Sequence, residues 1–228
     1  MLDKPDKLCY NFPKELNRTS IVHNNVTGGG VVMTACSCTF FNHRRKQMKD
    51  ERKNDIENTT YRFLEEQGAV SIPVDVNALA SKLGFKVKKT NFSDKAITGM
   101  ILVNENEKIP NVDTNMFIAV SSWLDEQKAR FILAHELGHF SLHKKAKQPL
   151  FAYRDTDQRS GSLVEDEAEL YARALLMPRP SVKAAVRVYK EDEELSKEYG
   201  SLTAFISKIF NVSHKKAYDR LDELNVLC

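Results

Sequence analysis

The order of hydrophobic and polar residues from position 48 onward predicts two early helices. Met48 to Gly68 carries apolar residues at helical spacing among charges, and Gly68 follows the expected end. A shorter helix is expected after Pro73, with Asp75 as its N-cap and Gly84 beyond its end. Three short segments then have the apolar pattern of strands, namely residues 85–88, 100–103 and 116–120.

The second half of the chain is predicted to be mostly helical. Ser122 and Asp125 form a start resembling a capping box for a long helix that ends near Lys144. The polar residues 145–162 are expected to form a loop, and a second helix runs from 164 to 177. Strands followed by packed helices indicate an α+β fold, with a small antiparallel sheet packed against helices.

The charge of the chain is concentrated in its first fifth. Lys and Arg number 34 against 31 Asp and Glu, but residues 1–47 hold seven and three of these, so residues 48–228 are slightly acidic. The basic excess is therefore no argument for nucleic-acid binding by the rest of the chain. No apolar run reaches the ~18 residues of a membrane span, and four cysteines are too few for a disulfide scaffold at this length.

Residues 1–47 show neither helical nor strand periodicity, and we expect a poorly ordered extension. Cys36, Cys38 and His43 lack a fourth metal ligand, which favours reduced surface thiols over a metal site. If Arg44 and Arg45 are encoded by a ribosome-binding sequence, translation starts at Met48; the alternative is a basic tail that contacts anionic partners. No apolar segment suited to an export signal is present, so a cytoplasmic location is expected.

The chemistry is carried by an HExxH pattern on the long predicted helix. His135 and His139 are four residues apart and thus lie on one helix face, from which both imidazoles can reach one Zn²⁺. Glu136 is displaced around the helix, where a carboxylate can act on a metal-bound water. The alternative is a pair of partly buried histidines that happen to have this spacing.

A catalytic zinc ion needs a third protein ligand, for which the second helix is the better source. Glu167 continues an apolar face of that helix, and a carboxylate directed into the core needs a partner. Zinc held by two His and one Glu would supply it; a buried ion pair with an Arg or Lys is the alternative. His143 lies ~12 Å along the helix from His135, too far to share one ion.

At these residues the sequence resembles the ImmA/IrrE family of metallo-endopeptidases. The resemblance implies that His135, His139 and Glu167 bind the metal and that Glu136 is the catalytic carboxylate. Glu169 stands where the family often has Asn. In the long helix that ends near Lys144, the matching residues are Phe131, Ala134 to His139 and His143. In the helix over 164–177 and just after it, they are Glu167, Ala168, Tyr171, Ala172 and Leu175 to Pro178.

The last residues, 201–228, have the pattern of a helix-turn-helix, with Asn211 at the turn and Ser213 as the cap of the second helix. Four Lys and Arg against three acids give no clear basic face. This favours packing or docking of a substrate protein over direct DNA contact, which stays open as the weaker alternative.

These observations predict a zinc-dependent endopeptidase, with Mn²⁺ or another divalent ion as the alternative metal. The family resemblance implies that its substrate is a helix-turn-helix repressor, whose cleavage derepresses a mobile element, prophage or stress genes. The alternative is a non-catalytic regulator that binds a repressor or DNA through its C-terminal helices. We expect a metallopeptidase domain over 48–200 and the helix-turn-helix-like tail over 201–228, packed on it.

Overall fold

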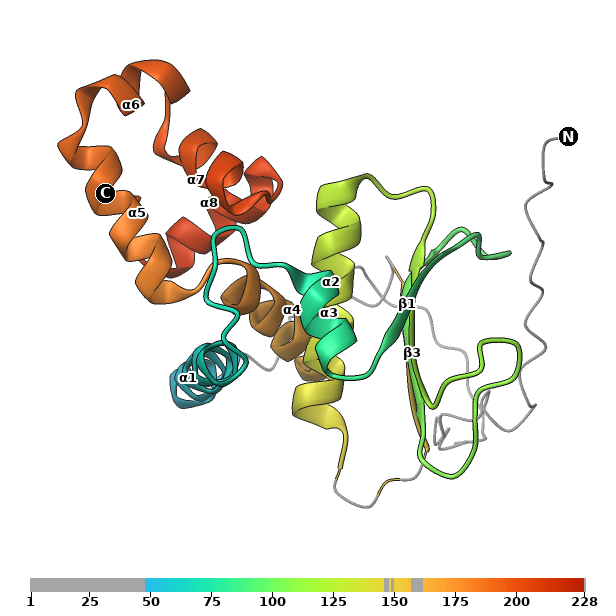
Figure 1. Cartoon of the computed structure of the whole chain (residues 1–228). Helices are drawn as coiled ribbons and strands as arrows, with labels where there is room; N and C mark the ends of the chain where they lie inside the picture. Colours follow the sequence, from blue (N-terminus) through green and yellow to red (C-terminus); the bar gives the residue numbers. More distant parts are fainter. Residues whose placement is uncertain (1–47, 146–147, 149, 157–161, 228) are drawn as a thin grey trace, which may run out of the picture. The chain divides into compact units, whose positions relative to one another are not determined.

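The structure is a computed structural model that describes residues 48–145, 148, 150–156 and 162–227 (Figure 1). The predictions for residues 1–47 lie outside the described residues. The α+β class is confirmed. The helices are α1 (Asp50–Glu66), α2 (Val76–Lys82), α3 (Glu126–His143), α4 (Leu163–Leu176), α5 (Arg179–Glu191), α6 (Glu193–Tyr199), α7 (Leu202–Phe210) and α8 (His214–Glu223), and the strands are β1 (Lys86–Thr90), β2 (Ile97–Asn104), β3 (Met116–Ser121) and β4 (Leu150–Thr156).

The sheet is mixed, whereas the sequence predicted an antiparallel one. Its strand order is β1-β3-β2-β4, with β2 antiparallel to both β3 and β4. β1, however, pairs parallel to β3. Apolar periodicity indicates that a strand exists but not which neighbour it takes, so the parallel pair at this edge had no signal in the sequence.

The fourth strand lies in the segment predicted to be a loop, and this prediction was wrong. In β4, Phe151 is buried and Tyr153 half-buried, whereas Leu150 and Ala152 are exposed. This is the two-residue alternation of a strand with one covered face. The surrounding polar residues, Pro and Gly favoured a loop, and two aromatic residues are too few to show the alternation of a strand.

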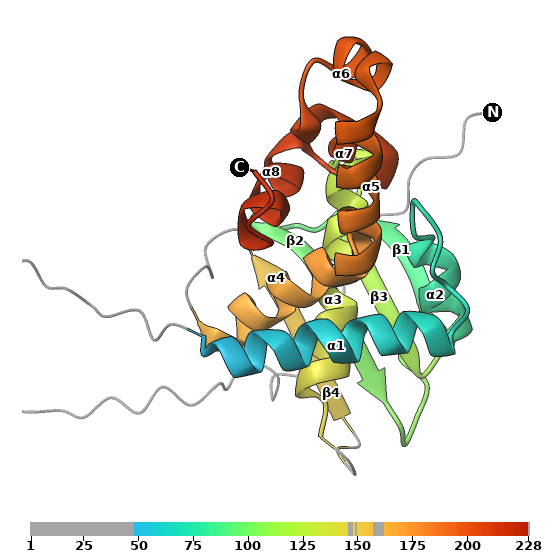
Figure 2. The same cartoon turned by 90° about the vertical axis from the view of Figure 1, so that its left-hand side faces the viewer.

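Helix α3 is the central element of the fold. It packs on β2 and β3 on one side and on α4 on the other, and α1 packs against α4 (Figures 1 and 2). Its residues from Arg130 to His139 are nearly all buried, as expected of a helix that is covered all round. Asp125 caps the helix by accepting a hydrogen bond from the Lys128 amide, so the cap is Asp125 itself and not Ser122.

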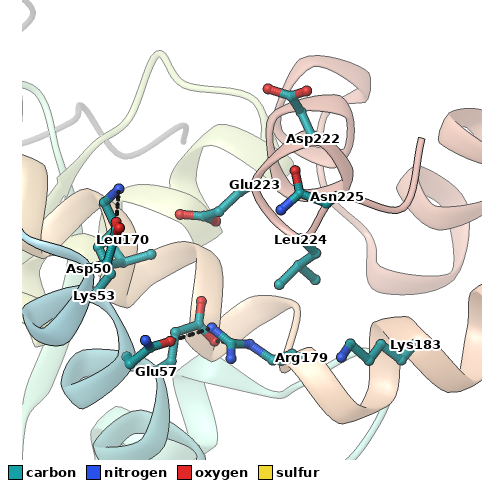
Figure 3. Close-up of a pocket in the computed structure, with 11 residues that line it drawn as sticks. Asp50, Lys53, Glu57, Leu170, Arg179, Lys183, Asp222, Glu223, Leu224 and Asn225 are labelled. Carbon is teal, nitrogen blue, oxygen red and sulfur yellow. Dashed lines mark hydrogen bonds and ion pairs between the residues drawn. The ribbon is translucent and has the colours of Figure 1, made fainter. Parts of the chain in front are cut away.

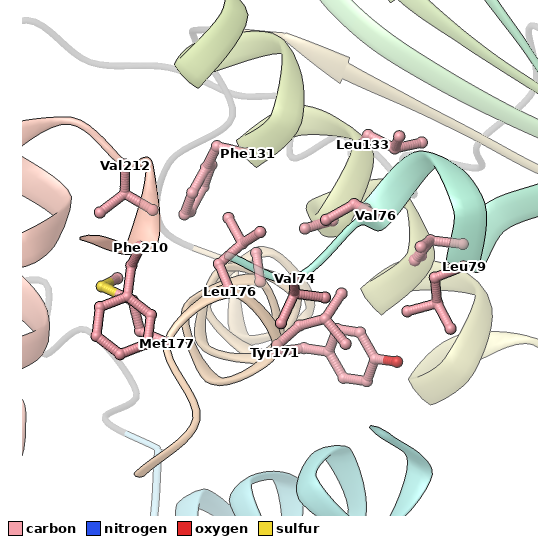
Figure 4. Close-up of a cluster of buried hydrophobic side chains, with 14 of the residues drawn as sticks. Val74, Val76, Leu79, Phe131, Leu133, Tyr171, Leu176, Met177, Phe210 and Val212 are labelled. Atoms are coloured by element: carbon pink, nitrogen blue, oxygen red, sulfur yellow. The ribbon is translucent and has the colours of Figure 1, made fainter. Parts of the chain in front are cut away.

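Part of the apolar core lies between α3, α4 and the segment that leads into α2. Figure 4 shows Phe131 of α3, Leu176 of α4 and Val74 pointing toward one another. Arg130 closes this region by donating hydrogen bonds to the Val74 carbonyl at 2.8 Å and to the carbonyls of Phe210 and Asn211. Two of these carbonyls, those of Phe210 and Asn211, stand at the end of α7, where backbone acceptors have no partner within the helix.

The last four helices pack on one another and form a layer. α7 contacts α5, α6 and α8, and Phe205 packs against the rings of Tyr189 and Tyr199 with centroids 5.3 and 5.2 Å apart. The two predicted short helices around the turn are confirmed as α7 and α8. Asn211 adopts the left-handed conformation at the turn, and Ser213 caps α8 by accepting from the Lys216 amide.

A buried ion pair ties this layer to the first helix. Arg220 of α8 is fully buried, donates to both carboxylate oxygens of Glu57 on α1, and donates to the Met177 carbonyl at 3.0 Å. Glu223 accepts a further hydrogen bond from Arg220 at 2.8 Å. Glu57 and Glu223 also line a pocket between α1, α5 and α8, together with Arg179 (Figure 3). None of the helices in the described ranges is long and apolar enough to cross a membrane.

We predict that Arg220→Met lowers the free energy of unfolding by about 3–5 kcal/mol, because it leaves the buried Glu57 carboxylate without its main partner. The measurement is urea unfolding followed by circular dichroism. Lys215→Met is the matched control, since its exposed pair with Asp219 on the same helix should contribute little. Equal stability of the two variants would contradict the prediction.

Candidate metal centre

Helix α3 places the two predicted histidines next to each other. The Nε2 atoms of His135 and His139 are 3.0 Å apart, and the two rings meet edge to face. His135 is buried and His139 fully so. The i, i+4 spacing therefore places both imidazoles on one helix face, and the Nε2 atom of each ring points to the same place.

Glu165 of α4 completes the group. Its Oε2 atom lies 3.2 Å from Nε2 of His135 and 3.5 Å from Nε2 of His139. Burial opposes ionisation of this carboxyl, but its two histidine neighbours, of which His135 lies within hydrogen-bonding distance, hold its pKa far below the usual range. In the part of the chain that the structure describes, this is the group of His, Cys, Asp or Glu side chains that could hold a metal ion.

The spacing of these three atoms fits a tetrahedral metal. Ligands that are ~2.0–2.1 Å from zinc at tetrahedral angles are separated by about 3.3 Å. The three distances in the structure, 3.0, 3.2 and 3.5 Å, bracket that value. Two imidazoles and one carboxylate also match the donor set of catalytic zinc sites, in which the fourth position is left to water or substrate.

The structure does not bring Glu167 to the histidine pair, and Glu165 replaces it as the candidate third ligand. Both carboxylate oxygens of Glu167 accept hydrogen bonds from Arg52 of α1, at 2.9 and 2.8 Å. Nε2 of His143 lies 3.1 Å from the same carboxylate. The alternative considered for Glu167, an ion pair with a basic residue elsewhere, is therefore the arrangement that the structure has.

The rotation of α4 about its axis decides which glutamate faces the histidines. At Gly138 a Cβ atom would lie 3.1 Å from the Ala168 carbonyl oxygen, so the two helices meet closely at this pair. Glu165 is one turn before Ala168 and thus shares its face. The sequence signal was the line of Glu165, Ala168 and Ala172, whose small residues suit a close approach to Gly138.

Glu136 lies beside the first ligand and is fully buried. Its carboxylate packs against β2 at Gly99, where a Cβ atom would lie 2.6 Å from Oε1 of Glu136 and 2.5 Å from Cγ2 of Ile132. The absence of a side chain at this strand position therefore makes the space in which the carboxylate sits. The structure thus keeps all three residues of the HExxH pattern within one buried region.

Further side chains lie next to the two candidate histidine ligands. Nδ1 of His139 is 3.2 Å from Nδ1 of His143, and Tyr153 of β4 stacks on the His139 ring with centroids 3.7 Å apart. Burial lowers the pKa of both His139 and His143, which favours their neutral forms. Glu169, an exception to the family pattern, pairs with Arg173 and Lys216, and its Oε2 is 4.0 Å from Nδ1 of His135.

Comparison with known proteins agrees with this geometry. The family model described as the IrrE N-terminal-like domain matches residues 80–222, more than half of the chain, including the whole group of candidate ligands. The chain belongs to the IrrE N-terminal-like family. This is a family of metal-dependent peptidases, which indicates a metallopeptidase-like role for the chain.

None of the curated protein sequences compared with the chain matches it. Among solved structures, a Mycobacterium tuberculosis transcriptional regulator is similar, with 15% sequence identity and a TM-score of 0.44. The alignment covers 75% of this chain and 48% of the regulator, so the chain spans about half the length of that protein.

The assignment of the third ligand predicts different effects for two glutamates that lie close together on α4. Glu165→Ala should weaken Zn²⁺ binding more than Glu167→Ala, because only the first removes an atom within bonding reach of both histidines. Chelator competition measures the two affinities, and circular dichroism checks that both variants fold. A stronger loss from Glu167→Ala would return that residue to the role predicted from the sequence.

The space at Gly99 gives a second prediction. Gly99→Ala should displace the Glu136 carboxylate and lower stability by about 1–3 kcal/mol, because its methyl group would overlap Ile132 and Glu136. Zn²⁺ binding should persist, since none of the three candidate ligands is touched. Thermal unfolding and zinc content measure the two effects; loss of zinc from a folded variant would contradict the assigned role of Gly99.

Proposed function

We propose that the chain is a zinc-dependent endopeptidase that hydrolyses a peptide bond in a protein substrate. The observation that carries the proposal is the convergence of His135, His139 and Glu165 at distances suited to one ion, beside the buried carboxylate of Glu136. Zinc is the metal expected for this donor set, with Mn²⁺ as the alternative. Membership of a peptidase family supports the same reaction class.

In this proposal, three side chains bind the metal and Glu136 transfers the proton. A divalent ion on the three ligands would polarise the scissile carbonyl and activate a water molecule. Glu136 would accept a proton from that water at its carboxylate and donate it to the nitrogen of the leaving amine. The missing side chain at Gly99 leaves the space that the carboxylate of Glu136 occupies, and such placement beside the ligands is what proton transfer needs.

We further propose that the substrate is a helix-turn-helix transcriptional repressor, whose cleavage relieves repression of a mobile element, prophage or stress genes. This substrate class is implied by the resemblance to the ImmA/IrrE family. A protease that acts on a transcription factor works where its substrate is, which agrees with the expected cytoplasmic location and with a role in transcription regulation.

The alternative, direct DNA binding through α8, has little support. Of the basic residues on this helix, Arg220 is buried with Glu57, and Lys216 pairs with Glu169 and lies 3.9 Å from the centre of the Phe131 ring. Lys215 pairs with Asp219. Two of the three cations are thus engaged within the protein, and the exposed Lys215 stands beside an acidic residue. Binding to a phosphate backbone depends on a cluster of cations that are free to contact it.

The proposed chemistry is tested by Glu136→Gln. The variant should retain zinc and lose cleavage of a helix-turn-helix repressor from the same genome by at least ~100-fold, because the proton acceptor is gone while the ligands are intact. Purified protein is mixed with the repressor, with and without a chelator, and fragments are followed by mass spectrometry. Glu126→Gln, at an exposed position of the same helix, is the matched control.

The same variant separates the enzyme from the non-catalytic regulator. If the protein acts by binding, Glu136→Gln should still derepress the target genes in cells, because the docking surface is unchanged. If it acts by hydrolysis, derepression and fragments should disappear together. Metal-dependent cleavage that persists in Glu136→Gln would refute the catalytic role of this residue.

A further inference from the structure

A chain of hydrogen bonds leads from the candidate metal ligand His139 to the first helix. Nδ1 of His139 is 3.2 Å from Nδ1 of His143, and Nε2 of His143 is 3.1 Å from Oε2 of Glu167. Glu167 is held in turn by two guanidinium nitrogens of Arg52, at 2.9 and 2.8 Å. The proposed proton transfer and metal binding use none of His143, Glu167 and Arg52.

The carboxylate of Glu167 determines which atom donates in each of these hydrogen bonds. An ionised carboxylate only accepts hydrogen bonds, so Nε2 of His143 must carry the proton that it shares with Glu167. A neutral imidazole has one proton, which leaves Nδ1 of His143 as an acceptor. Nδ1 of His139 must therefore be the donor of the next bond.

This direction has a consequence for the metal site. With its proton on Nδ1, His139 has a free lone pair on Nε2, the atom that lies 3.0 Å from Nε2 of His135 and 3.5 Å from Glu165. That is the form in which imidazole binds a metal. In the opposite tautomer, the proton would stand on the ligating atom and would have to leave first.

We propose that Arg52, Glu167 and His143 are positioning residues that fix His139 in its metal-binding tautomer before the metal arrives. The inference rests on the metal site of the proposed function and adds the residues that prepare it. The two histidine ligands differ in this respect: Nδ1 of His135 is 4.0 Å from Glu169, beyond hydrogen-bonding distance. The chain therefore reaches the outer nitrogen of His139 and not that of His135, whose Nε2 lies 3.2 Å from Glu165 and can donate to that carboxylate in the metal-free protein.

The direct test uses the metal-free wild-type protein. Nitrogen-15 correlation spectra of the histidine side chains show which ring nitrogen carries the proton. The expected result is opposite tautomers on the two residues, with the proton on Nδ1 in His139 and on Nε2 in His143. A proton on Nε2 of His139 in the metal-free protein would overturn the inference, whatever the activity of the enzyme.

Variants test the effect on metal binding. His143→Phe keeps a ring and removes both hydrogen bonds, and should weaken Zn²⁺ binding about 10–100-fold, the usual range for partners behind a ligand. His143→Asn keeps an acceptor near the Nδ1 position and should lose less. Asp166→Asn, next to Glu167 on α4, is the matched control and should bind zinc as the wild type does.

The outcomes separate this inference from the proposed function. If the wild type binds Zn²⁺ and His143→Phe binds it equally tightly, the positioning role is refuted while the metal site stands. If the wild type binds no Zn²⁺, the proposed function fails, and the tautomer spectra still decide whether the hydrogen-bond chain has the stated direction. Circular dichroism of each metal-free variant identifies any that fails to fold, and in that case the wild-type spectra alone decide the inference.

Discussion

Two helices can share one metal only where their backbones come close together, and in this protein that point is Gly138 against Ala168. A methyl group at residue 138 would already crowd the Ala168 carbonyl, so the pair sets both the separation and the rotation of α3 and α4. With the rotation set, Glu165 lies opposite the histidines and Glu167 lies toward α1. The group of candidate ligands is thus a consequence of helix packing as much as of the HExxH motif.

The parts of the site that depend on local geometry could be predicted from the sequence. The four-residue spacing of His135 and His139 on a continuous helix places both rings on one face in any fold. The helix itself was predictable from its apolar positions and from Asp125, whose side chain caps the first turn. Such features are determined within one or two helical turns, and the rest of the protein does not alter them.

The parts that depend on tertiary contacts could not be predicted in the same way. Helix α4 buries most of its circumference after residue 167, so an apolar face continues from Glu167 although its carboxylate lies toward α1. The ion pair of Glu167 joins residues 115 positions apart in the chain. The parallel edge strand has the same cause, because pairing between distant segments leaves no periodic signal in either of them.

The ion pairs made by α1 also bear on where the functional unit begins. The family model starts at residue 80 and ends at 222, yet Arg52 holds Glu167 and Glu57 holds the buried Arg220. Glu223, the other carboxylate on Arg220, lies just past the end of the match. A domain boundary drawn at the matched region would therefore leave Glu167 and the buried Arg220 without these partners. The smallest piece of this chain that keeps them paired starts ahead of α1 and continues through the last turn of α8.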